Sequence, residues 1–161
     1  MKKYAIITMD VEDWYHTYFP EVDVDRSISL LDGLDVALEI MKKDNIHGSF
    51  FVVGEIADKL ADKLRVMDKE GHDIAVHSCQ HLRHVTMTPG EFRSQLIEAK
   101  QKVEEILGHE VRGYRAPSFG IDDERLDIVR ECGFRYDSSK LKAQKSAKYG
   151  VLNLKGFKET V

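Results

Sequence analysis

Three short clusters of polar side chains could carry chemistry, and the first of them is acidic. Asp10, Glu12 and Asp13 fall within a stretch of four residues. Carboxylates this close repel one another unless a cation or protons offset their charges. The cluster is therefore a candidate cation site, although an acidic and solvent-exposed end of a strand would look the same in the sequence.

A second cluster places two histidines, separated by three residues, in the motif HSCQH. If His77 and His81 lay on a helical turn, this spacing would direct both imidazoles to one side, as a zinc ion requires. Seven histidines among 161 residues make one such pair plausible by chance. The pair therefore indicates a metal site only in combination with other ligands.

The third cluster is RAPSFG, residues 115–120. Its arginine could orient a carboxylate, and the turn fixed by proline could expose backbone N–H groups, although an ordinary loop has the same composition. Together the clusters supply two imidazoles and one carboxylate, which is the ligand set of a catalytic zinc site with one position open for water. Because a second carboxylate could act as a base, the combination predicts a metal-dependent hydrolase.

Each cluster follows a segment that is predicted to be a strand. Strands are expected at 4–9, 49–53, 73–76 and 111–115, with weaker candidates at 134–136 and 151–154. Helices are expected at 30–45, 56–67, 88–108 and 122–133, and the third is the best marked because Thr88 and Glu91 can form a capping box. This alternation predicts an α/β protein with a parallel sheet, either doubly wound or part of a (β/α) barrel. In both architectures the site lies at the carboxyl ends of the strands.

Composition excludes several classes of protein. The 161 residues, 42% apolar and 32% charged, are typical of one soluble globular domain, which we assign to 1–161. The net charge of −4, with both signs interspersed, disfavours nucleic acid or an anionic membrane as a partner. No apolar run approaches the roughly 20 residues of a membrane span, and Asp10 interrupts the first apolar stretch before it reaches signal-peptide length. With two cysteines and no disulfide framework, we expect a cytoplasmic protein.

The order of the three clusters resembles that of the polysaccharide deacetylases of the NodB homology, or carbohydrate esterase family 4, type. The stretches that carry the resemblance run from about residue 4 to residue 139: DVEDWYH, SFFVVGEIADK, EGHDIAVHSCQH, VRGYRAPSFGI and GFRYDSS. They resemble the stretches of a branch linked to exopolysaccharide synthesis. The resemblance implies a distorted (β/α) barrel, a divalent metal that is usually zinc, and removal of N-acetyl groups from the amino sugars of a polysaccharide or oligosaccharide.

The resemblance also implies the metal ligands. His77 and His81 match the two histidine ligands of the family. The acidic ligand of the family would stand directly after the first aspartate, but Val11 occupies that position here. Glu12 or Asp13 must therefore take its place, and the sequence does not choose between them.

The remaining roles follow from the same comparison of motifs. Asp10 matches the catalytic base of the family, and Arg115 matches the arginine that orients it. Pro117 shapes the loop that follows, and the backbone N–H of Ser118 would help to form the oxyanion hole. Trp14 could stack on a sugar ring or pack against the rim of the barrel.

The general acid of the family is a histidine in a late motif, whereas no histidine follows His109 in this sequence. The resemblance therefore implies a chain truncated at its C-terminus. His16 and His84 are the disfavoured alternatives for a substitute acid. Two other functions stay open: a related hydrolase of cyclic ureides or imides, and an inactive protein that binds a metal or a sugar. A homo-oligomer could complete the barrel.

Overall fold

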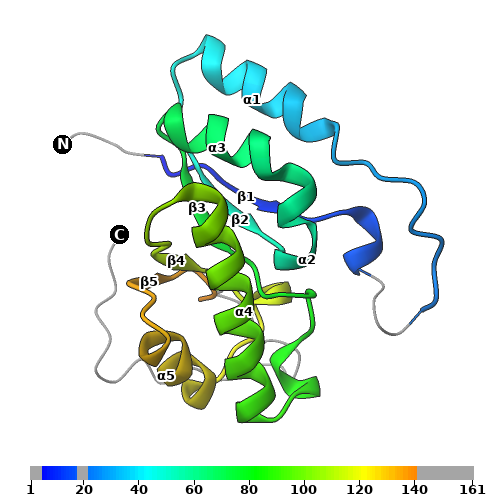
Figure 1. The fold of residues 1–161 in the computed structure, drawn as a ribbon, viewed down its shortest axis with the longest axis vertical. Coiled ribbons are helices and arrows are strands. Elements are labelled where there is room, and N and C mark those ends of the chain that lie inside the picture. The colour runs from blue at the N-terminus through cyan, green and yellow to red at the C-terminus, as the bar shows by residue number, and fades with distance from the viewer. Residues whose placement is uncertain (1–4, 18–21, 141–161) are drawn as a thin grey trace.

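The computed structural model describes residues 5–17 and 22–140, and within them five strands form one parallel sheet. The strands are β1 (Thr8–Val11), β2 (Ser49–Val52), β3 (Asp73–Val76), β4 (Gly113–Tyr114) and β5 (Tyr136–Asp137). Their order in the sheet is their order in the chain, and every neighbouring pair is parallel (Figure 1). A doubly wound sheet reverses its strand order at a switch point, so the sequential order agrees with the (β/α) barrel alternative.

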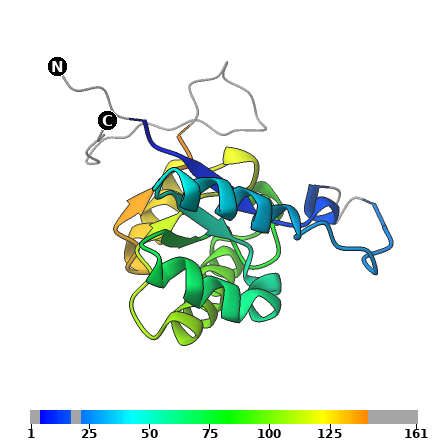
Figure 2. The ribbon, with the colours of Figure 1, turned by 90° about the horizontal axis from the view of Figure 1, so that it is seen from above.

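The helices that connect the strands lie beside one another in the order of the chain. They are α1 (Gly33–Lys43), α2 (Gly54–Ala57), α3 (Ala61–Lys69), α4 (Pro89–Leu107) and α5 (Asp123–Glu131), with the 3-10 turns η1 (Trp14–Thr17), η2 (Asp58–Leu60), η3 (His84–Thr86) and η4 (Pro117–Phe119). An ion pair of 2.5 Å between Asp35 and Lys63 joins α1 to α3, and α4 packs between α3 and α5. Figure 2 shows α3 and α4 along one side of the strands, with α1 drawn across the front of β1.

Alternation along the strands divides their side chains between two faces of the sheet. Phe50 and Val52 pack into the hydrophobic core with the helices. Phe51, between them, faces the other side, where the guanidinium carbon of Arg115 lies 4.0 Å from the centre of its ring. The register pairs Asp10 with Phe51, so the carboxylate of Asp10 lies on this second face. The second face therefore carries the polar chemistry.

The prediction of a strongly marked helix at 88–108 is confirmed by α4. Thr88 accepts a hydrogen bond from the N–H of Glu91, and the Glu91 carboxylate accepts one from the N–H of Thr88. Gly108 ends the helix in the left-handed conformation, at φ 78°. These signals are local in sequence, which explains why the bounds could be predicted closely.

The expectation of a strand at 4–9 was wrong in its position. β1 begins at Thr8 and includes Asp10, while Ile6 is 78% exposed. The neighbouring strand β2 begins only at Ser49, whose N–H donates to the carbonyl of Ile7. An apolar run predicts a strand, but the length of the strand depends on the backbone partner beside it.

Other expected elements also changed. The single helix expected at 56–67 is divided into α2, η2 and α3. The strand expected at 134–136 lies one to two residues later, at β5, because Phe134 packs in the core. Strand 111–115 shortens to the two residues of β4. The strand expected at 151–154 lies outside the described residues. In the described part of the chain, no helix is long and apolar enough to cross a membrane.

Candidate metal centre and catalytic residues

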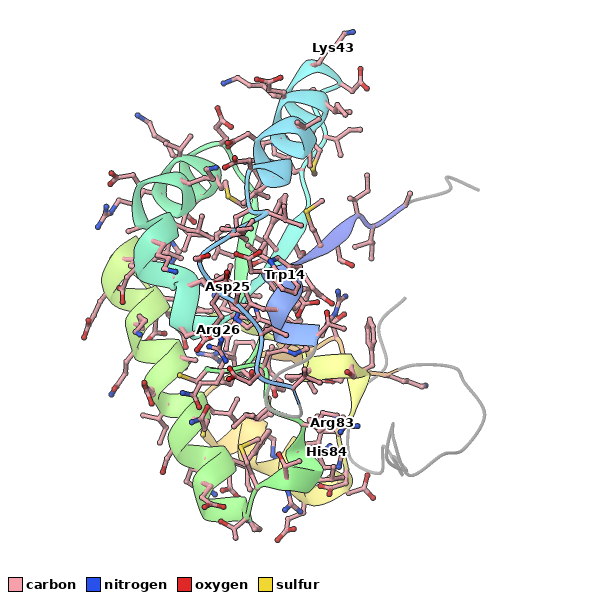
Figure 3. All side chains as sticks on the ribbon, turned by 90° about the vertical axis from the view of Figure 1, so that its right-hand side faces the viewer. Trp14, Asp25, Arg26, Lys43, Arg83 and His84 are labelled. Carbon is pink, nitrogen blue, oxygen red and sulfur yellow. The ribbon has the colours of Figure 1, made fainter. Side chains whose placement is uncertain are left out.

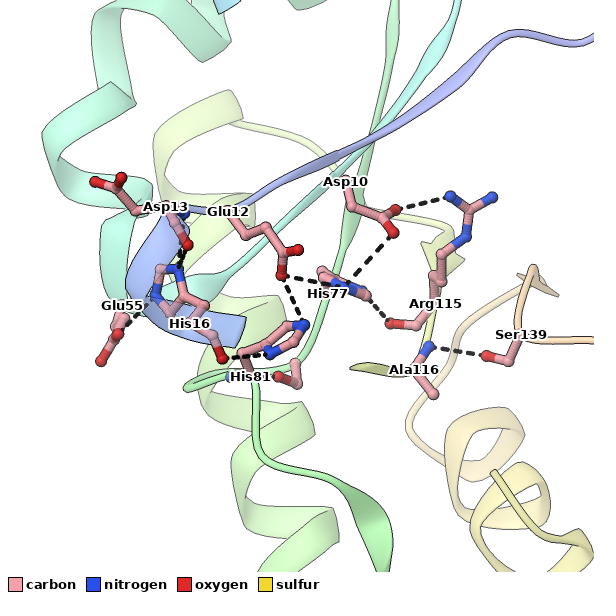
Figure 4. A network of polar contacts seen from close by, with 11 residues as sticks. Asp10, Glu12, Asp13, His16, Glu55, His77, His81, Arg115, Ala116 and Ser139 are labelled. Atoms are coloured by element: carbon pink, nitrogen blue, oxygen red, sulfur yellow. Dashed lines mark hydrogen bonds and ion pairs between the residues drawn. The ribbon is translucent and has the colours of Figure 1, made fainter. Parts of the chain in front are cut away.

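One carboxylate and two imidazoles converge beyond the carboxyl ends of β1 and β3. Glu12 Oε2 lies 2.6 Å from His81 Nε2 and 3.8 Å from His77 Nε2. The three candidate ligand atoms all lie within 4.8 Å of one another (Figure 4). Glu12 directly follows β1 and His77 directly follows β3, and parallel strands bring these ends to the same edge of the sheet.

The two histidines are joined by a tight loop, and the expectation that they share a helical turn was wrong. Ser78 and His81 both adopt the left-handed conformation, at φ 63° and 58°. The hydroxyl oxygen of Ser78 accepts a hydrogen bond of 2.8 Å from the N–H of His81 and closes the loop. The loop, and not helical periodicity, therefore brings the rings of His77 and His81 together, with centroids 5.0 Å apart.

Backbone carbonyl groups fix the tautomers of both imidazoles. His77 Nδ1 lies 2.8 Å from the carbonyl oxygen of Arg115, and His81 Nδ1 lies 3.1 Å from that of His16. A carbonyl oxygen only accepts, so each Nδ1 carries the hydrogen and each Nε2 presents a lone pair. Histidine ligands of metals are held in this way.

The residues fit a divalent cation. Glu12 Oε2 is buried and receives no hydrogen bond in the described part of the chain. With both imidazoles in the Nδ1–H form, three electron-rich atoms face one another at short distance. A cation between them would relieve this repulsion, and nitrogen with carboxylate oxygen is the ligand set that zinc and similar ions accept.

The protonation states agree with this fit. Burial lowers the pKa of His77 to about 4, which keeps the imidazole neutral at physiological pH. Burial alone would raise the pKa of Glu12, but the nearby His81 and His77 hold the pKa below its usual range. A neutral imidazole and an ionised carboxylate are the forms that bind metals.

Asp13 lies outside this group, so the structure separates the two acids that the sequence left as alternatives. Its side chain is buried, and Oδ1 accepts hydrogen bonds from the N–H groups of Trp14, at 3.0 Å, and Leu30, at 2.9 Å. The carboxylate of Asp13 thereby joins η1 to the segment that leads into α1. The hydrogen bonds of Asp13 therefore hold the backbone at Trp14 and Leu30 in place.

Asp10 and Arg115 form a hydrogen-bonded ion pair next to the three candidate ligands. Arg115 Nη1 donates to Asp10 Oδ1 at 2.7 Å, while Asp10 Oδ2 lies 3.8 Å from His77 Nε2. The other guanidinium nitrogens donate to Thr8 Oγ1 and to both oxygens of Ser138, its carbonyl and its hydroxyl. Because Arg115 is buried and held on several sides, it fixes the orientation of the Asp10 carboxylate.

The loop after β4 is held by a residue to which the sequence assigned no role. Ser139 Oγ accepts the N–H of Ala116 at 2.8 Å and donates to Asp137 Oδ2 at 2.7 Å. Pro117 is buried, and Ser118 adopts the left-handed conformation, at φ 53°. The sequence did contain a signal for Ser138 and Ser139, because DSS, residues 137–139, directly follows the strand predicted at 134–136.

The other predicted residues lie around this centre. Trp14 is half-buried on η1, and its indole N–H donates to the carbonyl of Ile28 at 3.0 Å. Both ring nitrogens of His16 are engaged, by the N–H of Asp13 and by Glu55, so His16 is not supported as a substitute acid. His84 is buried 3.6 Å from Asp122 and well separated from Trp14 in Figure 3, so the structure does not support His84 in that role either.

The chain belongs to the polysaccharide deacetylase family, whose model matches residues 30–136. The match includes both histidines and Arg115, whereas Asp10 and Glu12 lie before it. A peptidoglycan-N-acetylmuramic acid deacetylase of Bacillus subtilis is 28% identical over 120 residues, which cover 70% of this chain and 46% of that relative. The chain spans no more than 48% of three other curated relatives that it matches.

Solved structures show the same fold. A family 4 acetyl xylan esterase from Clostridium thermocellum, in complex with a cobalt ion, matches with a TM-score of 0.60 and 21% identity over 77% of this chain and 53% of its own. A carbohydrate esterase family 4 pseudoenzyme from Bacillus anthracis matches with a TM-score of 0.64 and 22% identity over 81% of this chain and 41% of its own. The prediction of a deacetylase-type α/β fold is therefore confirmed, but both an enzyme and a pseudoenzyme share this fold.

Proposed function

We propose that the chain is a metal-dependent deacetylase that hydrolyses N-acetyl groups on the amino sugars of a polysaccharide or oligosaccharide. The observation that carries the proposal is the convergence of Glu12 Oε2, His77 Nε2 and His81 Nε2 beside the pair of Asp10 and Arg115. Family membership supports hydrolysis of an acetyl group. Because a pseudoenzyme has the same fold, the argument for activity rests on these side chains.

In this proposal Glu12, His77 and His81 hold one divalent cation, with zinc as the expected ion. The cobalt complex of the acetyl xylan esterase supports a divalent ion in this fold. A bound divalent cation supplies Lewis-acid chemistry, which polarises oxygen and makes water a better nucleophile. Asp13 takes no part in binding the ion, because its carboxylate anchors backbone N–H groups.

Asp10 is the proposed general base. One of its oxygens is held by Arg115, and the other is directed toward the candidate ligands. Asp10 would remove a proton from the water that attacks the acetamide carbonyl, while the C–O bond of a tetrahedral adduct forms. Positioned bases of this kind contribute roughly 10²- to 10⁴-fold to a rate.

The loop after β4 would stabilise the negative charge that develops on the carbonyl oxygen. In the proposal the N–H of Ser118 donates to this oxygen, a contribution of roughly 3 kcal/mol for one donor. The left-handed conformation of Ser118 and the hydrogen bond from Ala116 N–H to Ser139 preorganise the loop. Collapse of the adduct breaks the C–N bond, and the leaving nitrogen takes up the proton that Asp10 accepted from the water, so that acetic acid and the free amine are released.

The names of two relatives support the proposed substrate class. The Bacillus subtilis relative is named for N-acetylmuramic acid of peptidoglycan, and another relative is named a chitin deacetylase. We place the sugar near Trp14, which directly follows the acidic cluster in the chain. A polymer of N-acetylated amino sugars is therefore the proposed substrate.

The experiment is release of acetate from N-acetylglucosamine oligomers and from peptidoglycan by the chain as purified, stripped of metal with a chelator, and reloaded with zinc. We expect acetate release that is lost with the chelator and restored by zinc. Zinc binding without acetate release on either substrate would contradict deacetylation and indicate a pseudoenzyme. Acetate release that persists after complete metal removal would contradict the metal dependence.

A further inference from the structure

Glu55, in the short helix α2, contacts the loop that carries the two histidines. Its backbone N–H donates to the carbonyl of Cys79 at 2.8 Å, and the N–H of Gly54 donates to the carbonyl of Ser78 at 3.0 Å. Ser78 and Cys79 lie between His77 and His81 in the chain. The first turn of α2 therefore supports one side of the histidine loop.

The side chain of Glu55 contacts the turn on the other side of His81. Glu55 Oε1 lies 2.7 Å from His16 Nε2, and the N–H of Asp13 donates to His16 Nδ1 at 2.8 Å. Because a backbone N–H can only donate, Nδ1 is the accepting nitrogen and Nε2 carries the hydrogen that Glu55 receives. The ring of His16 is therefore fixed at both nitrogens, with its side chain fully buried.

The carbonyl of His16 completes the connection to the metal centre. It accepts the hydrogen bond of 3.1 Å from His81 Nδ1, which sets the direction of His81 Nε2 toward Glu12. Glu55 fixes the ring of His16 and also binds the loop that carries His81. It therefore restrains both structures that orient the His81 imidazole, namely the His16 carbonyl and this loop. Figure 4 shows Glu55, His16 and His81 in this succession.

We propose that Glu55 is a positioning residue of the metal centre, which acts through His16 and the histidine loop to hold His81 in its ligating orientation. This inference rests on the proposed function, because it concerns the same three ligands. In the described part of the chain, Glu55 forms hydrogen bonds or ion pairs with His16, Arg26 and the carbonyl of Cys79, and none with the candidate ligand side chains. Its role is to hold the carbonyl and the loop that orient one of them.

The packing around α2 supports this role. A Cβ on Gly54 would lie 3.0 Å from the Cβ and 3.2 Å from the Cα of Ala99 in α4, and 3.3 Å from the Cα of Cys79. Glycine at position 54 therefore lets α2 pack directly between α4 and the histidine loop. The hydrogen bond from His16 holds the pKa of Glu55 below its usual range, and Arg26 lies 3.7 Å from Oε1, so the accepting carboxylate stays ionised.

The test compares Glu55→Met, which keeps the length of the side chain but removes the acceptor, with Glu55→Gln, which keeps an acceptor for His16 Nε2–H. Cobalt(II) is titrated into each metal-free protein, and the visible d–d spectrum reports ligand geometry. We expect Glu55→Met to bind cobalt about 10-fold more weakly with an altered spectrum, because loss of outer contacts to ligands costs roughly 10- to 100-fold in affinity. Glu55→Gln should restore the affinity and spectrum of the wild type.

Asp58→Ala is the matched control, because Asp58 lies on the neighbouring turn with its side chain 70% exposed and its nearest ion pair, at 3.5 Å, is with Lys102. Asp58→Ala should match the wild type in cobalt affinity and in spectrum.

If Glu55→Met does not fold, as judged by circular dichroism of the metal-free protein, Glu55→Ala takes its place. Equal affinity and an equal spectrum in wild type and the acceptor-free variant would overturn the role of Glu55 alone. Absence of cobalt binding in the wild type would instead overturn the metal centre, and the role of Glu55 with it.

Discussion

Arg115 Nη1 and Asp10 Oδ1 form a hydrogen bond of 2.7 Å between residues that are 105 positions apart in the sequence. This contact joins β1 to the loop after β4 across the carboxyl edge of the sheet. The backbone carbonyl of the same arginine accepts the Nδ1–H of His77. Arg115 therefore orients both the proposed base and one of the three proposed ligands.

The first prediction distinguishes the two neighbouring acids. Glu12→Gln should weaken zinc binding by at least about 100-fold, because it replaces the only charged ligand of the proposed set. Asp13→Ala should leave zinc affinity within about 2-fold but lower the free energy of unfolding by roughly 1–3 kcal/mol, because the N–H groups of Trp14 and Leu30 lose their acceptor.

Zinc titration and chemical denaturation of the two variants measure these effects. Equal loss of zinc affinity in both variants would show that both carboxylates reach the ion, contrary to the geometry. A loss of zinc affinity in Asp13→Ala alone would show that Asp13, and not Glu12, is the acidic ligand.

The second prediction concerns the base. Asp10→Asn should keep one zinc ion per chain, because its carboxylate is not among the three convergent ligand atoms. Acetate release should fall by roughly 10²- to 10⁴-fold, the usual contribution of a positioned base. Steady-state assays on N-acetylglucosamine oligomers, with zinc content measured on the same samples, test it. An Asp10→Asn protein with wild-type turnover would exclude Asp10 as the base.

The third prediction is a pH dependence of stability in the metal-free protein. The pKa of His77 is about 4 in the folded chain, against 6.5 for an unperturbed histidine. The unfolded chain therefore binds a proton first as the pH falls, and stability that is complete above pH 6.5 is lost as the pH falls toward 4. For a shift of this size the loss is about 3 kcal/mol.

Urea unfolding of the metal-free chain between pH 7 and 4 measures this loss, and His77→Gln should flatten the profile by the same amount. A wild-type profile that stays level over this range, or one that His77→Gln leaves unchanged, would show that His77 titrates near its ordinary pKa when folded.

The sequence was most informative where the signals are local or where the motif order is specific. The ends of α4 follow from the capping box at Thr88 and from Gly108, and both lie within a turn of the boundary that they set. The grouping of the acidic cluster, the histidine pair and Arg115 followed from parallel strands, which bring the carboxyl ends to one edge. These predictions required no knowledge of side-chain packing.

Other features depend on contacts that sequence spacing does not encode. Glu12 and Asp13 are adjacent acids, but the carboxylate of Asp13 accepts the N–H groups of Trp14 and Leu30 instead of joining His77 and His81. The left-handed conformations of Ser78 and His81 replace the expected helical turn, since the loop is held by hydrogen bonds to α2. The link from Glu55 to His16 joins residues that are 39 positions apart and form no known local motif.

Metal content is the most direct test of the central claim, that the acidic cluster and the histidine pair form one metal site. Elemental analysis of the purified chain, before and after zinc reconstitution, should give close to one ion per chain for the wild type. His77→Ala and His81→Ala should each lose tightly bound zinc, because each removes one of three ligands. A wild-type chain without any ion after reconstitution, or full occupancy in both histidine variants, would contradict the account.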